Sequence, residues 1–117
     1  MKIDENYVDS VEYYYQAMKA KHAVDRERIM TAKTPGAAKR MGRSVEMVDN
    51  WHEIKYNVMY KAILHKCIAF PDFLFRLQHS GQIVEWNTWG DTTWGATLDG
   101  VGCNALGVQL MFLRDNL

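Results

Sequence analysis

The sequence predicts a mostly helical α+β domain with a few short strands, and three observations support this. Several stretches carry apolar residues at helical spacing and are bounded by residues that start or stop helices. Only residues 82–86 alternate as a strand does. The chain has 117 residues, of which 48% are hydrophobic, so it is long enough for one core and too short for two. We therefore predict a single domain over residues 1–117.

The helical stretches follow start and stop signals along the chain. Residues 3–9 are polar and are typical of an edge strand or a lead-in. The expected helices then cover residues 10–23, 25–33, 34–42, 50–70, 71–80 and 104–117. Each begins at a residue that favours helix starts: Ser10, Asp25, Thr34 with Pro35, Asp49 or Asn50, Pro71, and Asn104.

In the first expected helix, an acid, an amide and an amine gather beside the apolar face. Glu12, Gln16 and Lys19 are spaced by four and three residues and share one stripe of the helix. A solvated polar edge would give the same pattern, so the residues alone leave both interpretations open. The apolar face itself is expected to hold Val11, Tyr14, Tyr15, Met18 and His22.

Residues 85–107, EWNTWGDTTWGATLDGVGCNALG, concentrate three of the four tryptophans and many of the glycines. Glycines allow close backbone approach to a ligand, and indole rings offer flat stacking surfaces. Asp91, Asp99 and Asn104 are interleaved with them. The pattern is typical of a pocket wall, although a tight aromatic turn in an ordinary core fits it equally well.

Composition excludes several classes of function. A formal net charge of zero argues against binding nucleic acid by bulk electrostatics, and leaves only a local basic patch open. No stretch resembles a signal peptide or a membrane span, so we expect a soluble, cytoplasmic protein with no membrane partner. Cys67 and Cys103 lack CxxC spacing and are expected to be reduced, and the four histidines lack ligand spacing. We therefore expect neither a metal nor a cofactor.

Three separated blocks of the sequence resemble the YbiA-like, NADAR superfamily. TWGDTTWG at residues 88–95 and GVGCNALGVQLMFLRDNL at residues 100–117 are similar to its C-terminal half. SVEYYYQAMKAKH at residues 10–22 is similar to its Glu-His-x-x-Gln helix with the following lysine, and TPGAAKRMGR at residues 34–43 to its second signature. The resemblance covers nearly the whole chain and implies the family's fold.

The resemblance implies an N-glycosidase and assigns its residues. Members of the family cleave ribosylamino-pyrimidine phosphates of riboflavin biosynthesis, and others act on ADP-ribose attached to guanine. The family's acid falls on Glu12, its helix lysine on Lys19, and its tryptophan-aspartate signature on Trp89, Asp91 and Trp94.

Two departures from the family's pattern bear on activity. The position after the helix acid, usually His, is Tyr13, which alters any proton relay from that imidazole. The chain also begins almost at this helix and lacks the family's Phe-Ser-Asn-Phe segment, which walls the sugar site. Either another chain supplies that wall, as in a homodimer, or the pocket is more open.

The residues fit cleavage of a bond between a sugar C1 and a base nitrogen. Its oxocarbenium-like transition state needs nearby negative charge and an activated water, which Glu12 and Asp91 could supply. Trp89 and Trp94 offer stacking surfaces for the base, and Gln16 offers hydrogen bonds. Alternatively, a partly desolvated Lys19 could attack an opened sugar aldehyde and form a Schiff base.

The substrate's phosphate has two candidate locations. Arg40 and Arg43 belong to a basic cluster with Lys39, and the backbone amides at residues 102–104 precede the last helix, beside Asn104. A solvated face would explain the basic cluster equally well, and Asn104 is an adequate helix cap in its own right.

Two functions from different classes follow. The first is an N-glycosidase acting on a nucleotide-like small molecule, with ADP-ribosylated nucleic acid as a further partner. The second is a non-catalytic module or sponge that binds ADP-ribose or a related nucleotide through the same contacts.

Overall fold

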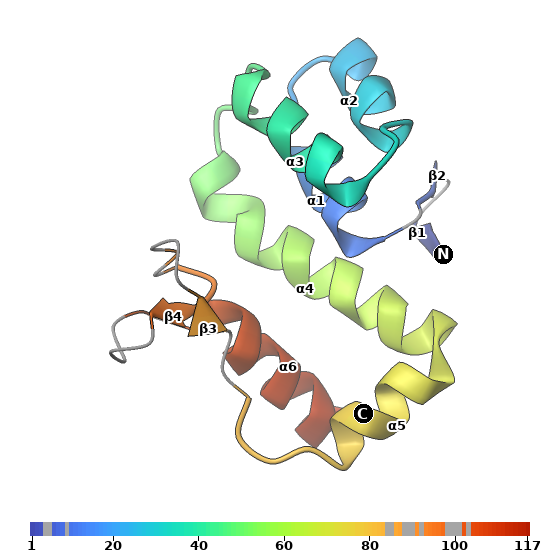
Figure 1. Cartoon of the computed structure of the whole chain (residues 1–117), viewed down its shortest axis with the longest axis vertical. Helices are drawn as coiled ribbons and strands as arrows, with labels where there is room; N and C mark the ends of the chain where they lie inside the picture. Colours follow the sequence, from blue (N-terminus) through green and yellow to red (C-terminus); the bar gives the residue numbers. More distant parts are fainter. Residues whose placement is uncertain are drawn as a thin grey trace. The chain divides into compact units, whose positions relative to one another are not determined.

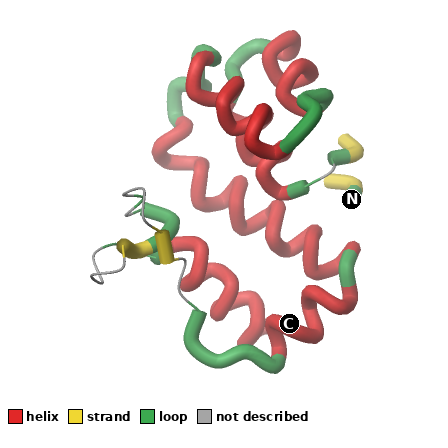
Figure 2. The backbone as a smooth tube through the Cα atoms, in the orientation of Figure 1, coloured by secondary structure: helices red, strands yellow, loops and turns green. Residues whose placement is uncertain are grey.

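A computed structural model gives the structure of the chain, which is mostly helical with short strands (Figures 1 and 2). It describes residues 1–3, 6–8, 10–83, 86–87, 91, 93–97, 102 and 104–117; for residues 6–7, 86–87 and 96–97 it describes the backbone only. The predicted class, a mostly helical α+β fold, is confirmed. Two compact units, Met1–Ala69 and Phe70–Leu117, are described separately below. The single domain over residues 1–117 stays a prediction.

The first unit opens with a two-stranded antiparallel hairpin. Strand β1 (Lys2–Ile3) pairs with β2 (Asn6–Tyr7), and Lys2 lies opposite Tyr7. Val8 donates its N–H to the carbonyl of Met1, which extends the pairing at 2.8 Å. The Ile3 side chain is fully buried, so the expected lead-in strand contributes directly to the core.

Helix α1 (Val11–Lys19) lies at the centre of this unit and contacts α2, α3 and α4. Helices α2 (Ala23–Met30) and α3 (Pro35–Ser44) lie beside it, and the long helix α4 (Trp51–Ala69) completes the unit (Figure 1). The core between these elements is closely packed. It is formed by Ile3, Val8, Tyr13, Tyr14, Ala17, Ala20, Ile29, Ala38 and Ala62.

The end of α1 differs from the sequence prediction, which extended this helix to residue 23. After Lys19 the backbone turns to antiparallel pairing: Ala20 bridges Met47, Lys21 donates to the Glu46 carbonyl at 2.8 Å, and Val48 donates to the Lys19 carbonyl at 3.0 Å. These bonds satisfy backbone groups that a longer helix would have used. His22 was wrongly placed on the buried face for the same reason, since it is exposed and its Nε2 lies 2.7 Å from Glu46 Oε2.

Two predicted N-terminal caps can be compared with the starts of α2 and α3. Thr34 caps α3 as predicted: its Oγ1 accepts the N–H of Ala37 at 3.0 Å, and Pro35 follows in the first turn. Asp25 does not cap α2, because the helix begins at Ala23 and Asp25 lies within its first turn. The Asp25 carboxylate still lies near the positive end of the helix dipole.

The longest predicted helix, over residues 50–70, is confirmed by α4. Trp51, Met59, Ala62, Ile63 and Cys67 are buried, and Tyr15 on α1 meets Trp51 edge to face with ring centroids 5.0 Å apart. Ala69, expected on the apolar face, is exposed at the end of the helix. Cys67 is a free, buried thiol whose pKa is raised by desolvation, as expected of a packed cysteine.

The second unit contains α5 (Pro71–Gln78), the parallel strands β3 (Trp86–Asn87) and β4 (Ala96–Thr97), and α6 (Ala105–Asn116). Of the predicted strand over residues 82–86, residues 82 and 83 are not in a strand and residue 86 begins β3, while residues 84–85 lie outside the described part of the chain. Helices α5 and α6 contact each other, and Leu77 and Leu113 are buried. Arg114 ties α6 to the end of α5 by donating from Nη1 to the Ser80 carbonyl at 3.2 Å and to the Gly81 carbonyl.

The start of α6 also corrects a prediction. Asn104 occupies the N-cap position, yet it adopts a left-handed backbone conformation with φ 51° and makes no side-chain cap bond. Its Nδ2 instead donates to the Ile83 carbonyl at 2.9 Å, and the helix starts at the next residue, Ala105. A Cβ at Gly107 would lie 2.5 Å from Asn104 Nδ2, so the glycine permits this close packing.

On α6, Leu113 is buried, whereas Leu117 is exposed. Near the end of this helix, Phe112 is also exposed. Within the part of the chain that the structure describes, no helix is both long enough and apolar enough to cross a lipid bilayer.

Candidate active site

The predicted acid, amide and amine come together on α1. Gln16 Nε2 donates to Glu12 Oε1 at 3.0 Å, one helical turn away. Lys19 lies one turn further on, near enough to Glu12 for that charge to raise its pKa. Glu12 and Lys19 are half-buried and Gln16 is buried, with 6% of its surface exposed. The solvated-edge interpretation is therefore wrong for Gln16. We call Glu12, Gln16, Lys19 and Arg43 the α1–α3 cluster.

Gly42 on α3 makes room for the buried Gln16 side chain. A Cβ at position 42 would overlap Gln16 Oε1 and would lie 2.8 Å from Gln16 Cδ. Any residue other than glycine would therefore force the Gln16 side chain to move. Sequence reasoning missed Gly42. A glycine inside a helix weakens the helix relative to alanine, so its presence indicates that packing requires it there.

The Gln16 amide is oriented with its nitrogen towards the Glu12 carboxylate. Gln16 Oε1 faces Gly42 and has no hydrogen-bond partner among the described residues, while Nε2 donates to the carboxylate. The reverse orientation would bring the amide oxygen against the acceptor-only carboxylate. An unpaired buried oxygen costs about 1–3 kcal/mol, and the charge-assisted bond to Glu12 offsets part of that cost. Gln16 thus fixes the position of the Glu12 carboxylate.

Burial and Arg43 lower the pKa of Lys19. Desolvation is the larger cause, the positive charge of Arg43 acts in the same direction, and the negative charge of Glu12 opposes both. A lysine with a lowered pKa has a larger fraction of neutral amine at a given pH, and the neutral amine is the nucleophile. The environment of Lys19 therefore suits the predicted covalent route.

Arg40 and Arg43, predicted together, are one helical turn apart on α3 but have different neighbours. Arg43 belongs to the α1–α3 cluster through its effect on Lys19. Arg40 turns back towards the start of α3, where Nη1 lies 3.7 Å from the Cβ position of Gly36, and it lines an open pocket beside α2. The structure thus divides the basic cluster between two surfaces.

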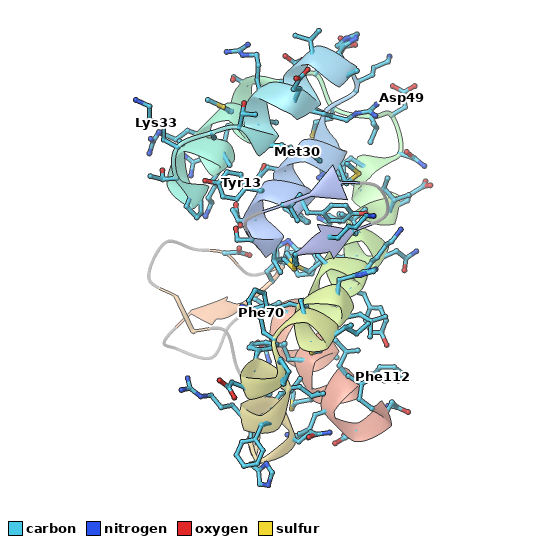
Figure 3. The ribbon with its side chains drawn as sticks, turned by 90° about the vertical axis from the view of Figure 1, so that its right-hand side faces the viewer. Tyr13, Met30, Lys33, Asp49, Phe70 and Phe112 are labelled. Carbon is cyan, nitrogen blue, oxygen red and sulfur yellow. The ribbon has the colours of Figure 1, made fainter. Side chains whose placement is uncertain are left out.

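Tyr13 is a core residue. Its side chain is 3% exposed, and its hydroxyl donates to the Ala32 carbonyl at 2.9 Å. Figure 3 shows it inside the unit, beneath the segment that joins α2 to α3. Tyr13 therefore supports that segment, and it points away from Glu12, which lies next to it in the sequence.

The candidate residues of the second unit form a turn. Asp91 Oδ1 accepts the backbone N–H groups of Thr93 at 3.1 Å and Trp94 at 3.0 Å, so one carboxylate oxygen orders the chain around Trp94. Asp91 and Trp94 are half-buried. Trp89 lies outside the described residues, as do Asp99 and Cys103. A cavity shared by the α1–α3 cluster and this turn stays a prediction, because the two belong to separate units.

Among the described residues, no group of three or more His, Cys, Asp or Glu side chains could hold a metal ion. The α1–α3 cluster supplies an acid, an amide and two cations.

The NADAR domain family matches residues 1–117. The chain belongs to the NADAR family. N-glycosidase YbiA of Shigella flexneri serotype 5b is 36% identical over 121 residues, which cover 100% of this chain and 75% of that protein. An N-glycosidase of Nostoc punctiforme is 31% identical, with 98% of this chain and 78% of that protein covered. The maize riboflavin biosynthesis protein PYRR, chloroplastic, is 34% identical over 92% of this chain and 19% of its own length.

Structural comparison agrees with this membership. The NMR structure of the E. coli protein YbiA matches with a TM-score of 0.88 at 34% identity, and the match covers 99% of this chain and 71% of that one. The family membership inferred from the three sequence blocks is therefore confirmed, as is the NADAR fold.

Proposed function

We propose that this NADAR protein is an N-glycosidase that hydrolyses the C1–N bond of a ribosylated, phosphorylated base. The observation that carries the proposal is the Glu12 carboxylate, held at 3.0 Å by the buried Gln16 amide beside a lysine of lowered pKa. The named N-glycosidases among its relatives support the same reaction class.

In this reaction the C1–N bond breaks as the sugar acquires oxocarbenium character, and the electron pair leaves with the base nitrogen. The Glu12 carboxylate stabilises the positive charge and takes a proton from the attacking water. That water adds to C1 as hydroxide, and the proton that Glu12 removed passes to the departing base nitrogen, so the products are a free sugar and a free base. A fixed, ionised carboxylate suits this task because it needs no reorientation during the reaction.

Lys19 offers an alternative, covalent route. Its neutral amine would add to C1 of the ring-opened sugar, displace the base and form a Schiff base, which water then hydrolyses. The lowered pKa of Lys19 supports this route. Arg43, whose charge acts on Lys19, would attract the substrate's phosphate.

In the second unit, we propose that Asp91 and Trp94 take part in binding the base of the substrate. The Asp91 hydrogen bonds to the backbone at residues 93 and 94 would hold the indole in place for stacking. Trp89 and Asn104 stay predictions as base-stacking and phosphate ligands. Because the side-chain amide of Asn104 is bound to the Ile83 carbonyl, its contribution would come from its backbone.

The substrate is proposed to be a ribosylamino-pyrimidine phosphate or an ADP-ribosylated guanine. The maize relative's name, riboflavin biosynthesis protein, favours the first. The test is to incubate the protein with each compound and to follow the free base by chromatography. Release of base that is abolished in Glu12→Gln and retained in Glu53→Gln, an exposed acid on α4, supports hydrolysis.

Two results would contradict the proposal. Base release that persists in Glu12→Gln would remove Glu12 from the mechanism. Tight binding of either compound, with the ligand recovered intact, would instead indicate the non-catalytic binding module.

A further inference from the structure

A pocket of about 600 Å³ lies between the end of α2 and the start of α3, apart from the α1–α3 cluster. Three cationic side chains line it, and none of its described lining residues is acidic: the cations are Arg28, Lys33 and Arg40. We propose that this pocket binds a phosphate or diphosphate group of a small molecule.

The cations of the pocket are largely uncompensated. The ion pair of Arg28 with Asp25 is long, at 4.0 Å, and 68% of the Arg28 side chain is exposed. Neither Lys33 nor Arg40 has an ion-pair or hydrogen-bond partner in the described part of the chain. Figure 3 shows Lys33 extending from the outer edge of the unit. Like charges gathered without counter-ions repel each other, so a bound anion would stabilise this arrangement.

Backbone carbonyls at the end of α2 already accept hydrogen bonds from side-chain hydroxyls. At the end of α2, the Thr31 hydroxyl donates to the carbonyls of Glu27 at 2.9 Å and Arg28 at 3.2 Å. The Tyr13 hydroxyl donates a hydrogen bond to the Ala32 carbonyl at 2.9 Å. The negative end of α2 is therefore capped at the point where it meets the pocket.

The opposite side of the pocket is the start of α3, the positive end of a ten-residue helix. Thr34 Oγ1 already accepts the Ala37 N–H and keeps its own O–H to donate. Arg40 reaches back along the helix, so its guanidinium lies above Gly36 at this same end. An oxyanion placed there would meet a fork of guanidinium donors, a hydroxyl and an ammonium group, which matches the chemistry of phosphate.

A small molecule fits better than a nucleic-acid backbone. The volume lies within the range of small-molecule sites, and the zero net charge of the chain argues against binding nucleic acid by bulk electrostatics. The inference does not depend on hydrolysis, since it concerns residues on the α2 side of α3. Binding at this pocket and base release by Glu12 can therefore fail separately.

The experiment is a titration of the intact chain with inorganic pyrophosphate at low salt, followed by calorimetry and by amide NMR shifts. We expect saturable binding that weakens as salt rises, with shifts at Gly36 and Ala37. The Lys33→Gln/Arg40→Gln double variant should bind about fivefold to tenfold more weakly for each cation removed. Lys39→Gln, which removes the same charge next to the pocket without lining it, should bind like the wild type.

Three results would overturn the proposal. They are the absence of saturable binding, equal affinity in the double variant, and shifts confined to Lys19 and Arg43. A single-stranded oligonucleotide that binds more tightly than pyrophosphate through Lys33 and Arg40 would assign the pocket to nucleic acid and would also overturn it. A melting curve of each variant confirms that the exposed substitutions leave the fold intact.

Discussion

The Gln16 side chain on α1 packs directly against the backbone of Gly42 on α3, and its amide nitrogen holds the Glu12 carboxylate at 3.0 Å. The position of the proposed catalytic acid thus depends on the absence of a side chain on a neighbouring helix. Gly42 acts through Gln16, so it is a positioning residue.

Replacing Gly42 with alanine should displace Gln16 and loosen Glu12. We expect a loss of about 1–3 kcal/mol in the free energy of unfolding, from overpacking, and a fall of about a hundredfold in the rate of base release. Gly36→Ala is the matched control, because a Cβ there would meet its neighbours at 3.7 Å and 3.9 Å. That variant should keep its activity and be equally stable or slightly more stable. Unchanged activity in Gly42→Ala would show that Gln16 does not position the acid.

Removing the Glu12 carboxylate should abolish catalysis without unfolding the protein. Glu12→Gln keeps the shape of the side chain and is expected to lower base release by about 10²–10⁴-fold. A Glu12→Asp variant, with a carboxylate about one bond shorter, should recover part of this loss. Single-turnover kinetics with chromatographic detection would measure both variants, and a wild-type rate in Glu12→Gln would contradict the role of the acid.

The pKa of Lys19 should respond to its two charged neighbours in opposite directions. Arg43 lowers this pKa, so Arg43→Gln should raise it; Glu12 raises it, so Glu12→Gln should lower it further. Because the pKa of Lys19 is lowered on folding, its protonation opposes folding at neutral pH. This penalty is relieved as the pH rises through the folded-state value. NMR titration of the dimethylated lysine resonance would measure each shift, and parallel shifts in the two variants would contradict the arrangement.

A covalent route through Lys19 predicts a trapped adduct. Borohydride added during turnover should link the sugar to Lys19 and leave the wild-type protein heavier by the mass of the reduced sugar. Lys39→Arg should still give the adduct, whereas Lys19→Arg should not. Mass spectrometry distinguishes the outcomes, and turnover with no adduct in any variant would favour direct attack by water.

The second unit offers a separate test of packing. A Cβ at Gly107 would lie 2.5 Å from the Asn104 amide nitrogen and would also clash with the Ile83 carbonyl, whereas one at Gly81 would meet nothing within 4 Å. Gly107→Ala should therefore lower the free energy of unfolding by about 1–3 kcal/mol, and Gly81→Ala should be close to neutral. Urea unfolding of the two variants would check this, and equal midpoints would contradict the packing at the start of α6.

Sequence patterns predicted the fold well where periodicity and capping agree. Thr34-Pro35 and Pro71 located the starts of α3 and α5, and the long apolar pattern located α4. The end of α1 was misjudged because pairing between Ala20 and Met47 is a non-local interaction, which no local pattern reveals. Asn104 was misjudged for a similar reason, since its partner, Ile83, lies far back in the chain.

The candidate site was partly predictable. Helical spacing alone places Glu12, Gln16 and Lys19 together, because these positions share a stripe of the helix. The burial of Gln16 could not be predicted, since it depends on α3 approaching closely at Gly42. The different surroundings of Arg40 and Arg43 could not be predicted either, because both residues are exposed and only the neighbouring helices distinguish them.

The backbone pairing that joins residues 19–21 to residues 46–48 closes the α2–α3 segment at its base. Because both ends of this segment are fixed, its length has little effect on the positions of the helices on either side of it. Relatives that insert or delete residues between α2 and α3 can therefore vary the shape of this segment while α1 and α4 keep their register. The closed base would let evolution change the ligand pocket independently of the acid and the amine.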